Sequence, residues 1–135
     1  MFDDVIAAPN VAQQIGADGE WLWRPAQAPG NGGVTLTFGY RNTPQGPRLR
    51  LYQSTDGSSF QPLTGDLEHQ GAPILGTESA IAFLSDGTAV AVVRRDSPGG
   101  PGLEPGLVGT ATDPLTNWAW TELDGYIAGP DLAVT

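Results

Sequence analysis

The sequence contains no cysteine and no lysine, and its only histidine is His69. Without cysteine the chain has no disulfide, no thiol nucleophile and no cysteine-based zinc site. A single histidine with no neighbouring ligand set does not make a metal site, so we expect neither a metal nor a cofactor. The absence of cysteine fits the cytoplasm and secretion equally, so the compartment stays open.

Basic residues are scarce. Six arginines stand against 15 acidic residues, which gives a formal net charge of −9. Such a surface repels phosphate backbones, so nucleic acid and anionic membranes are not expected partners. No run of apolar residues approaches the length that spans a membrane.

Turn-forming residues are abundant, with 19 glycines and 12 prolines among 135 residues. They separate short apolar segments, and this spacing is typical of short strands joined by tight turns. In residues 34–40, for example, Val34, Leu36, Phe38 and Tyr40 alternate with smaller or polar residues, which places them on one strand face. No convincing amphipathic helix is present. The chain therefore predicts a single all-β, antiparallel domain.

The expected strands form two similar four-strand units. Each unit ends in a polar turn that leads to an aromatic residue, Phe60 in the first and Trp118 in the second, which are 118 − 60 = 58 residues apart. A repeat of this size, built from short strands, is typical of β-propeller blades. The expected strands cover residues 21–24, 34–40, 49–54, 60–63, 79–84, 89–94, 107–111 and 118–122.

These units predict four parts within the single domain. Residues 1–17 form an N-terminal strand or linker, 18–70 blade one, 71–125 blade two, and 126–135 the start of a further blade. We expect additional end strands over Val5–Ala8 and Leu132–Val134. The dipeptide Asp86-Gly87 predicts a hairpin turn, because both residues tolerate positive φ.

The first polar turn resembles the Asp-box of the sialidase superfamily, Ser-x-Asp-x-Gly-x-Thr-Trp. Ser54, Asp56, Gly57 and Phe60 match it in kind, although the turn is one residue shorter. The resemblance implies a structural role, in which the carboxylate accepts hydrogen bonds from turn amides and the aromatic ring wedges between sheets. The alternative is an ordinary Asp-Gly hairpin.

The second unit, over residues 77–96, is similar to sialidase-type blades, with an acidic residue before a strand, an Asp-Gly-Thr turn and an Arg-Arg pair. The resemblance implies a central channel, and Glu78, Arg94 and Tyr40 are the candidate channel and ligand-binding residues. Family sialidases use an arginine triad, a Tyr nucleophile paired with a Glu, and an Asp acid/base. A complete set cannot be assigned here, so we assign no catalytic residue.

Each candidate also has a structural alternative. Glu78 would be a solvated or capping residue. Of the adjacent Arg94 and Arg95, one would pair with Asp96 or Glu78 and the other would lie at the surface, because neighbours on a strand face opposite sides. The two Trp-x-Trp pairs, Trp21 with Trp23 and Trp118 with Trp120, indicate packing between blades, with sugar stacking as the alternative.

Two blades do not make a propeller, and we expect their outer faces to be apolar. Burying such faces favours a closed homo-oligomer, and three copies would supply six blades. The sequence thus predicts a sialidase-like β-propeller fragment that self-assembles into a symmetric propeller, without enzyme activity of its own. The alternatives are a module that binds glycans or sialic acid and, last, an exo-sialidase type of glycoside hydrolase at the central channel.

Overall fold

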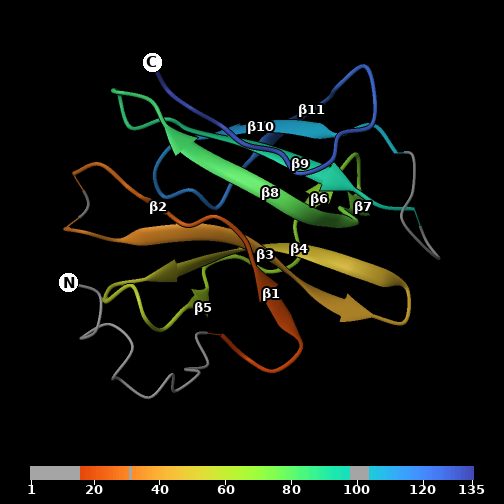
Figure 1. The fold of residues 1–135 in the computed structure, drawn as a ribbon, viewed down its shortest axis with the longest axis horizontal. Coiled ribbons are helices and arrows are strands. Elements are labelled where there is room, and N and C mark those ends of the chain that lie inside the picture. The colour runs from red at the N-terminus through yellow and green to blue at the C-terminus, as the bar shows by residue number, and fades with distance from the viewer. Residues whose placement is uncertain (1–15, 31, 98–103) are drawn as a thin grey trace, which may run out of the picture.

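The computed structural model describes residues 16–30, 32–97 and 104–135. Within these ranges the chain is all-β, with antiparallel strand pairing throughout and no helix (Figure 1). The all-β antiparallel prediction is therefore confirmed. The expected N-terminal strand over Val5–Ala8 lies outside the described residues.

The first sheet is an antiparallel meander. β1 and β2 both pair with β3 and together form one interrupted edge strand, bridged by the hydrogen bond from Trp23 N to Phe38 O at 2.9 Å. β3 then pairs with β4, and β4 with β5. The strands are β1 (Glu20–Leu22), β2 (Ala26–Gln27), β3 (Thr35–Thr43), β4 (Gly46–Ser54) and β5 (Gln61–Pro62).

The second sheet is a meander of four strands in the order β8-β9-β10-β11. The turn between β8 and β9 has Gly87 at φ +86°, and Leu84 N donates to Thr88 O at 2.8 Å, which confirms the predicted Asp-Gly hairpin. The strands are β8 (Gly76–Phe83), β9 (Ala89–Arg95), β10 (Leu107–Ala111) and β11 (Ala119–Glu122). A small hairpin, β6 (Glu68–His69) with β7 (Ala72–Pro73), connects the two sheets and was not predicted.

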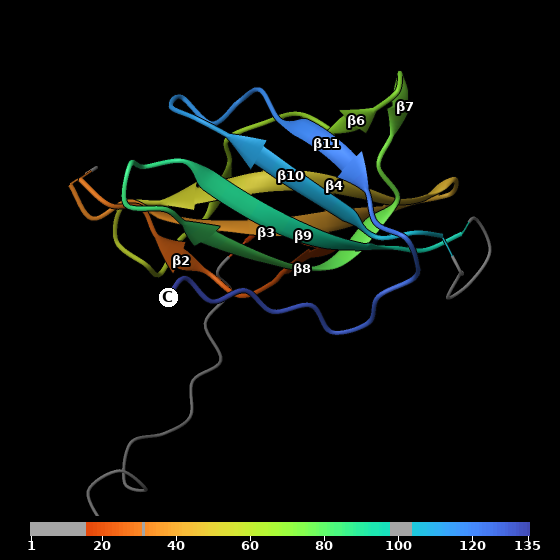
Figure 2. The ribbon, with the colours of Figure 1, turned by 90° about the horizontal axis from the view of Figure 1, so that it is seen from above.

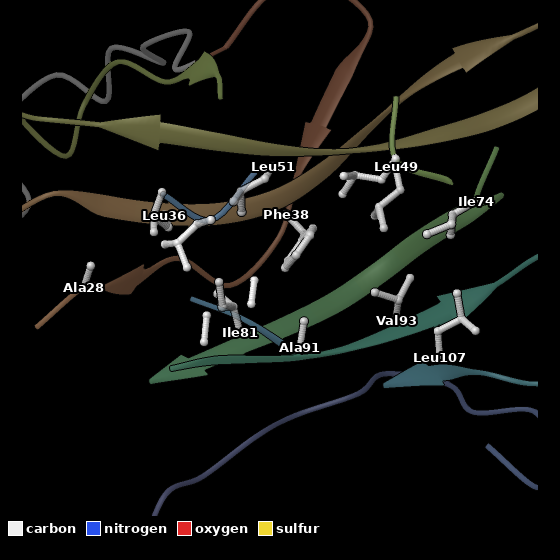
Figure 3. Packing of buried hydrophobic residues seen from close by; sticks show 14 residues of the cluster. Ala28, Leu36, Phe38, Leu49, Leu51, Ile74, Ile81, Ala91, Val93 and Leu107 are labelled. Atoms are coloured by element: carbon white, nitrogen blue, oxygen red, sulfur yellow. The ribbon is translucent and has the colours of Figure 1, made fainter. Parts of the chain in front are cut away.

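The two sheets pack face to face, and the core lies between them (Figure 3). Phe38 of β3 is 1% exposed and meets the rings of Trp118 and Trp120 edge-on, at centroid distances of 5.0 and 6.1 Å. The prediction that this tryptophan pair packs between the sheets is confirmed. Trp21 behaves differently, because it is 59% exposed. The core also contains Leu36, Leu49, Leu51, Ile74, Ile81, Val93 and Leu107.

The first strand of the second sheet, β8, packs across the first sheet and contacts β2, β3 and β4. At the other edge of the second sheet, residues 66–68, which follow β5, lie beside Trp118 and Trp120 of the β11 edge (Figure 2). Within the described ranges the sheets form no closed ring or barrel.

The C-terminal segment contradicts one expectation, because Leu132–Val134 is irregular backbone. Contacts made by side chains hold the segment, instead of the backbone hydrogen bonds that would join it to a neighbouring strand. Gly129 N donates to Glu78 Oε2 at 2.8 Å, and Asp131 pairs with Arg24 at 2.8 Å. The segment thus runs across β8 toward the first strand of the first sheet (Figure 2).

Candidate functional site

Two of the three candidate residues meet in an ion-pair cluster. Arg94, near the end of β9, places Nη1 3.1 Å from Oε2 of Glu78 on β8 and Nε 3.1 Å from Oδ1 of Asp96. Thr77 Oγ1 donates to the second Asp96 oxygen at 2.9 Å. A register shift in the β8–β9 pairing between Gly76 and Ser79 occurs at this point. The guanidinium therefore holds two carboxylates from two neighbouring segments.

Tyr40 of β3 completes the cluster from the other sheet. Burial raises the pKa of its phenol, the carboxylates of Asp96 and Glu78 raise it further, and Arg94 partly opposes them. The phenol therefore remains protonated at neutral pH and can act as a hydrogen-bond donor. The charges of Glu78 and Arg94 thus act on the Tyr40 phenol from the facing sheet.

The C-terminal segment adds contacts that sequence reasoning missed. The Arg94 guanidinium lies 5.5 Å from the centroid of the Tyr126 ring, a distance typical of a cation–π contact. The Gly129 amide donates to the same Glu78 oxygen that faces Arg94. Nothing in the sequence around Tyr126 indicated that it folds back onto β9. We call Tyr40, Glu78, Arg94, Asp96 and Tyr126 the Arg94 cluster.

The charges of the Arg94 cluster limit its chemistry. Although burial lowers the pKa of Arg94, the hydrogen bonds and charges of Glu78 and Asp96 raise it above its usual value. One guanidinium faces two carboxylates, so the cluster is not an unoccupied cationic clamp for an anion. It instead presents carboxylate acceptors and a phenol donor, which suit hydroxyl groups. Trp21 lies opposite Tyr40 in the β1–β3 register and adds an exposed ring.

Arg95 has a structural role. Its Nε donates to Pro105 O at 2.6 Å, and its Nη2 lies 2.8 Å from Glu122 Oε1. The side chain is only 14% exposed, so the expectation that one of the two arginines lies at the surface is wrong. The other expectation, pairing with Asp96 or Glu78, is confirmed because Arg94 pairs with both.

The turn over residues 54–60 contains a closed local network of hydrogen bonds. Asp56 Oδ1 accepts from the amides of Ser58 and Ser59 at 2.8 and 2.9 Å and from Ser54 Oγ at 2.9 Å. Gly57 has φ +72°, and its amide donates to Ser54 Oγ at 2.8 Å. These bonds, led by the two amides, hold the pKa of Asp56 well below its usual range. Phe60 is 7% exposed, so the whole motif organises the turn and anchors the strand that follows.

Other site types find no support in the described part of the chain. Residues 16–30, 32–97 and 104–135 contain no group of three or more His, Asp or Glu side chains arranged to hold a metal ion. In the same ranges no helix is long and apolar enough to cross a membrane. Comparisons of the chain with protein families, curated proteins and solved structures find no match.

Proposed function

We propose that the two sheets are neighbouring blades of a sialidase-like β-propeller and that the chain completes the ring with further copies of itself, three being favoured. The observation that supports this proposal is the face-to-face packing of two antiparallel meanders. β8 contacts β2, β3 and β4, and residues 66–68 meet the β11 edge. Antiparallel four-strand meanders are the repeating unit of a propeller.

The outer face of the second sheet favours self-assembly. Val92 sits near the middle of this face, with Ala80 and Val108 as its cross-strand neighbours, and Val92 and Val108 remain partly exposed. The expectation of two apolar outer faces is wrong for the first sheet. There Arg41 and Arg50, held by Asp66, occupy the face opposite the core. Because the two outer faces differ, the first-sheet face of one copy would contact the second-sheet face of the next. Such a head-to-tail contact can close into a ring.

A charge on the apolar face tests this assembly. We expect Val92→Glu to convert the oligomer to single chains, because the carboxylate would lose its hydration in the contact. The matched control is Gln61→Glu, which adds the same charge on the exposed strand β5. Sedimentation velocity measures both, and circular dichroism verifies that each variant folds. Equal sedimentation of wild type and Val92→Glu would contradict the proposed interface.

A second function, glycan binding, is favoured because polar groups of the Arg94 cluster lie near the exposed ring of Trp21. Tyr40, Glu78 and Asp96 supply a donor and acceptors for hydroxyl groups, and the exposed Trp21 supplies a ring for stacking. A sialic-acid carboxylate would have to displace Glu78 or Asp96 from Arg94. We therefore place binding ahead of catalysis, which needs a distinct acid, base and nucleophile.

A glycan array with the Arg94→Ala variant tests this binding site. Removing the guanidinium leaves Glu78 and Asp96 unpaired, so we expect the bound signal to be lost. The matched control is Arg48→Ala, because Arg48 donates to backbone carbonyls of its own hairpin, such as Pro47 O at 3.1 Å, and lies outside the Arg94 cluster. An unchanged signal in Arg94→Ala would remove the site assignment. Turnover of a fluorogenic sialoside by wild type would instead establish glycosidase activity.

A further inference from the structure

A separate cleft lies at the opposite edge of the sheets from β8. It is formed where the segment after β5 meets β11 and the loop before it, and its volume is about 350 Å³. Its two aromatic residues are Trp118 and Trp120, both partly exposed. Its polar lining residues are Asp66, Glu68, Thr116 and Asn117.

The aromatic side of the cleft is fixed in position. The rings of Trp118 and Trp120 stack with centroids 5.3 Å apart and planes inclined by 19°. Trp118 Nε1 donates to Leu115 O at 3.0 Å, which sets the orientation of that indole. Trp120 lies directly on the backbone of Gly109, where any Cβ atom would collide with its ring. A ligand would therefore meet a preformed aromatic surface and would not have to order it.

The polar side of the cleft is formed by exposed side chains. Glu68, Thr116 and Asn117 line the cleft and supply hydrogen-bond acceptors and donors. Asp66 also borders the cleft, but its carboxylate is held at 2.7 Å by Arg50 Nε and at 3.0 Å by Arg41 Nη2, on the face of the first sheet opposite the core.

From this geometry we infer that the cleft is a binding site for a neutral saccharide. The apolar face of a sugar ring packs against an aromatic ring, while its hydroxyls donate to carboxylates and exchange hydrogen bonds with an amide. Glu68 is an exposed acid in the cleft, whereas the charge of Asp66 is balanced by Arg41 and Arg50, so Glu68 disfavours an anionic sugar. The inference does not depend on the Arg94 cluster, none of whose residues lines this cleft, and it shares only Asp66 with the residues named for self-assembly.

Fluorine NMR of the whole chain labelled with 5-fluorotryptophan tests this inference. The four tryptophans give four signals, each assigned by replacing one tryptophan with phenylalanine. The probes are cellotriose, mannotriose and triacetylchitotriose, with 3′-sialyllactose as the anionic comparison. We expect at least one neutral probe to shift the Trp118 and Trp120 signals and to leave the Trp21 and Trp23 signals in place. Shifts confined to Trp21, or no shift with any neutral probe at millimolar concentration, would overturn the inference.

Two variants test whether residues of the cleft contribute to the affinity for the saccharide. Trp120→Ala should weaken the affinity for the responding saccharide about tenfold or more. Trp120 also packs in the core, so a second variant is placed in an exposed loop. We expect Asn117→Ala to weaken the affinity for the same saccharide about threefold. Leu84→Ala, which truncates an exposed apolar side chain outside the cleft and outside the Arg94 cluster, is the matched control and should leave the affinity unchanged. Unchanged affinity in Asn117→Ala and Trp120→Ala, or a loss in Leu84→Ala, would overturn the assignment to this cleft.

Discussion

At the scale of single residues, Asp56 shows how one carboxylate can organise a turn. It accepts from two amides and one hydroxyl, and its pKa is lowered as a result. We predict that Asp56→Ala lowers the melting temperature by more than Asp56→Asn, because asparagine retains an acceptor oxygen at the same place. Thermal melts followed by circular dichroism at pH 7 measure both.

The contribution of Asp56 to the stability of the fold should decrease as the pH falls. A carboxyl whose folded pKa lies below its unfolded value stabilises the fold above the unfolded pKa, and this contribution is lost as the pH falls through the folded pKa. The stability difference between wild type and Asp56→Asn should therefore shrink as the pH is lowered from 7 toward 2. A difference that stays constant or grows over this range would contradict the assigned role.

Gly39 is needed for the close approach of β1 to β3. A Cβ atom at this position would lie 2.6 Å from Trp21 O and 2.9 Å from the Tyr52 ring. Because the backbone oxygen cannot move cheaply, we predict that Gly39→Ala lowers the free energy of unfolding by about 2 kcal/mol. Gly65→Ala is the matched control, since nothing lies within 4 Å of its Cβ position. Urea denaturation measures both, and equal midpoints would show that β1 adapts to the extra methyl group.

At the scale of the elements, the sequence predicted the eight principal strands because apolar alternation and turn residues act over short distances. Residues 107–111 were predicted with the bounds that β10 has, and the Asp86-Gly87 turn is present. The strands β6 and β7 were not predicted, because two-residue strands that contain proline or charged residues show no alternation of apolar and polar residues. Leu132–Val134 has a strand-like composition, but among residues 16–30, 32–97 and 104–135 it pairs with no strand.

Of the Arg94 cluster, the sequence indicated only the ion pairs. Arg94 was expected to pair with Glu78 or Asp96 and pairs with both, whereas the role of Tyr40, Glu78 and Arg94 as channel residues stays a prediction. Tyr126 was missed because it reaches Arg94 only through the fold-back of an irregular segment. For the cleft at Trp118 and Trp120, the sequence indicated only sugar stacking as an alternative role of this tryptophan pair. Its other side could not be predicted, because residues 66–68 reach it through tertiary packing.

The C-terminal segment yields a prediction at this scale. Glu78 binds the Gly129 amide and also pairs with Arg94, so Glu78→Ala should release residues 126–131 from β8. We expect faster hydrogen exchange at the Gly129 amide, by about threefold to tenfold, which corresponds to one hydrogen bond. The control is Glu104→Ala, which removes an exposed acid elsewhere. Unchanged exchange at Gly129 in Glu78→Ala would mean that packing alone holds the segment.

At the scale of the whole molecule, the two outer faces differ in character. The second sheet presents partly exposed valines, whereas the first presents arginines held by Asp66. The face-to-face packing of the two meanders and the partly exposed valines support the proposed ring, and the chain's charge of −9 limits how closely copies approach at low salt. We therefore expect the assembly to tighten as salt screens this repulsion.

The central claim, that this pair of sheets completes a propeller with its own copies, is tested most directly by the mass of the unmodified chain in solution. Light scattering coupled to size exclusion at moderate salt measures that mass. The account predicts a discrete multiple of the 14.1 kDa chain, with three copies giving about 42 kDa. A folded single chain of 14.1 kDa across the accessible concentrations would contradict it.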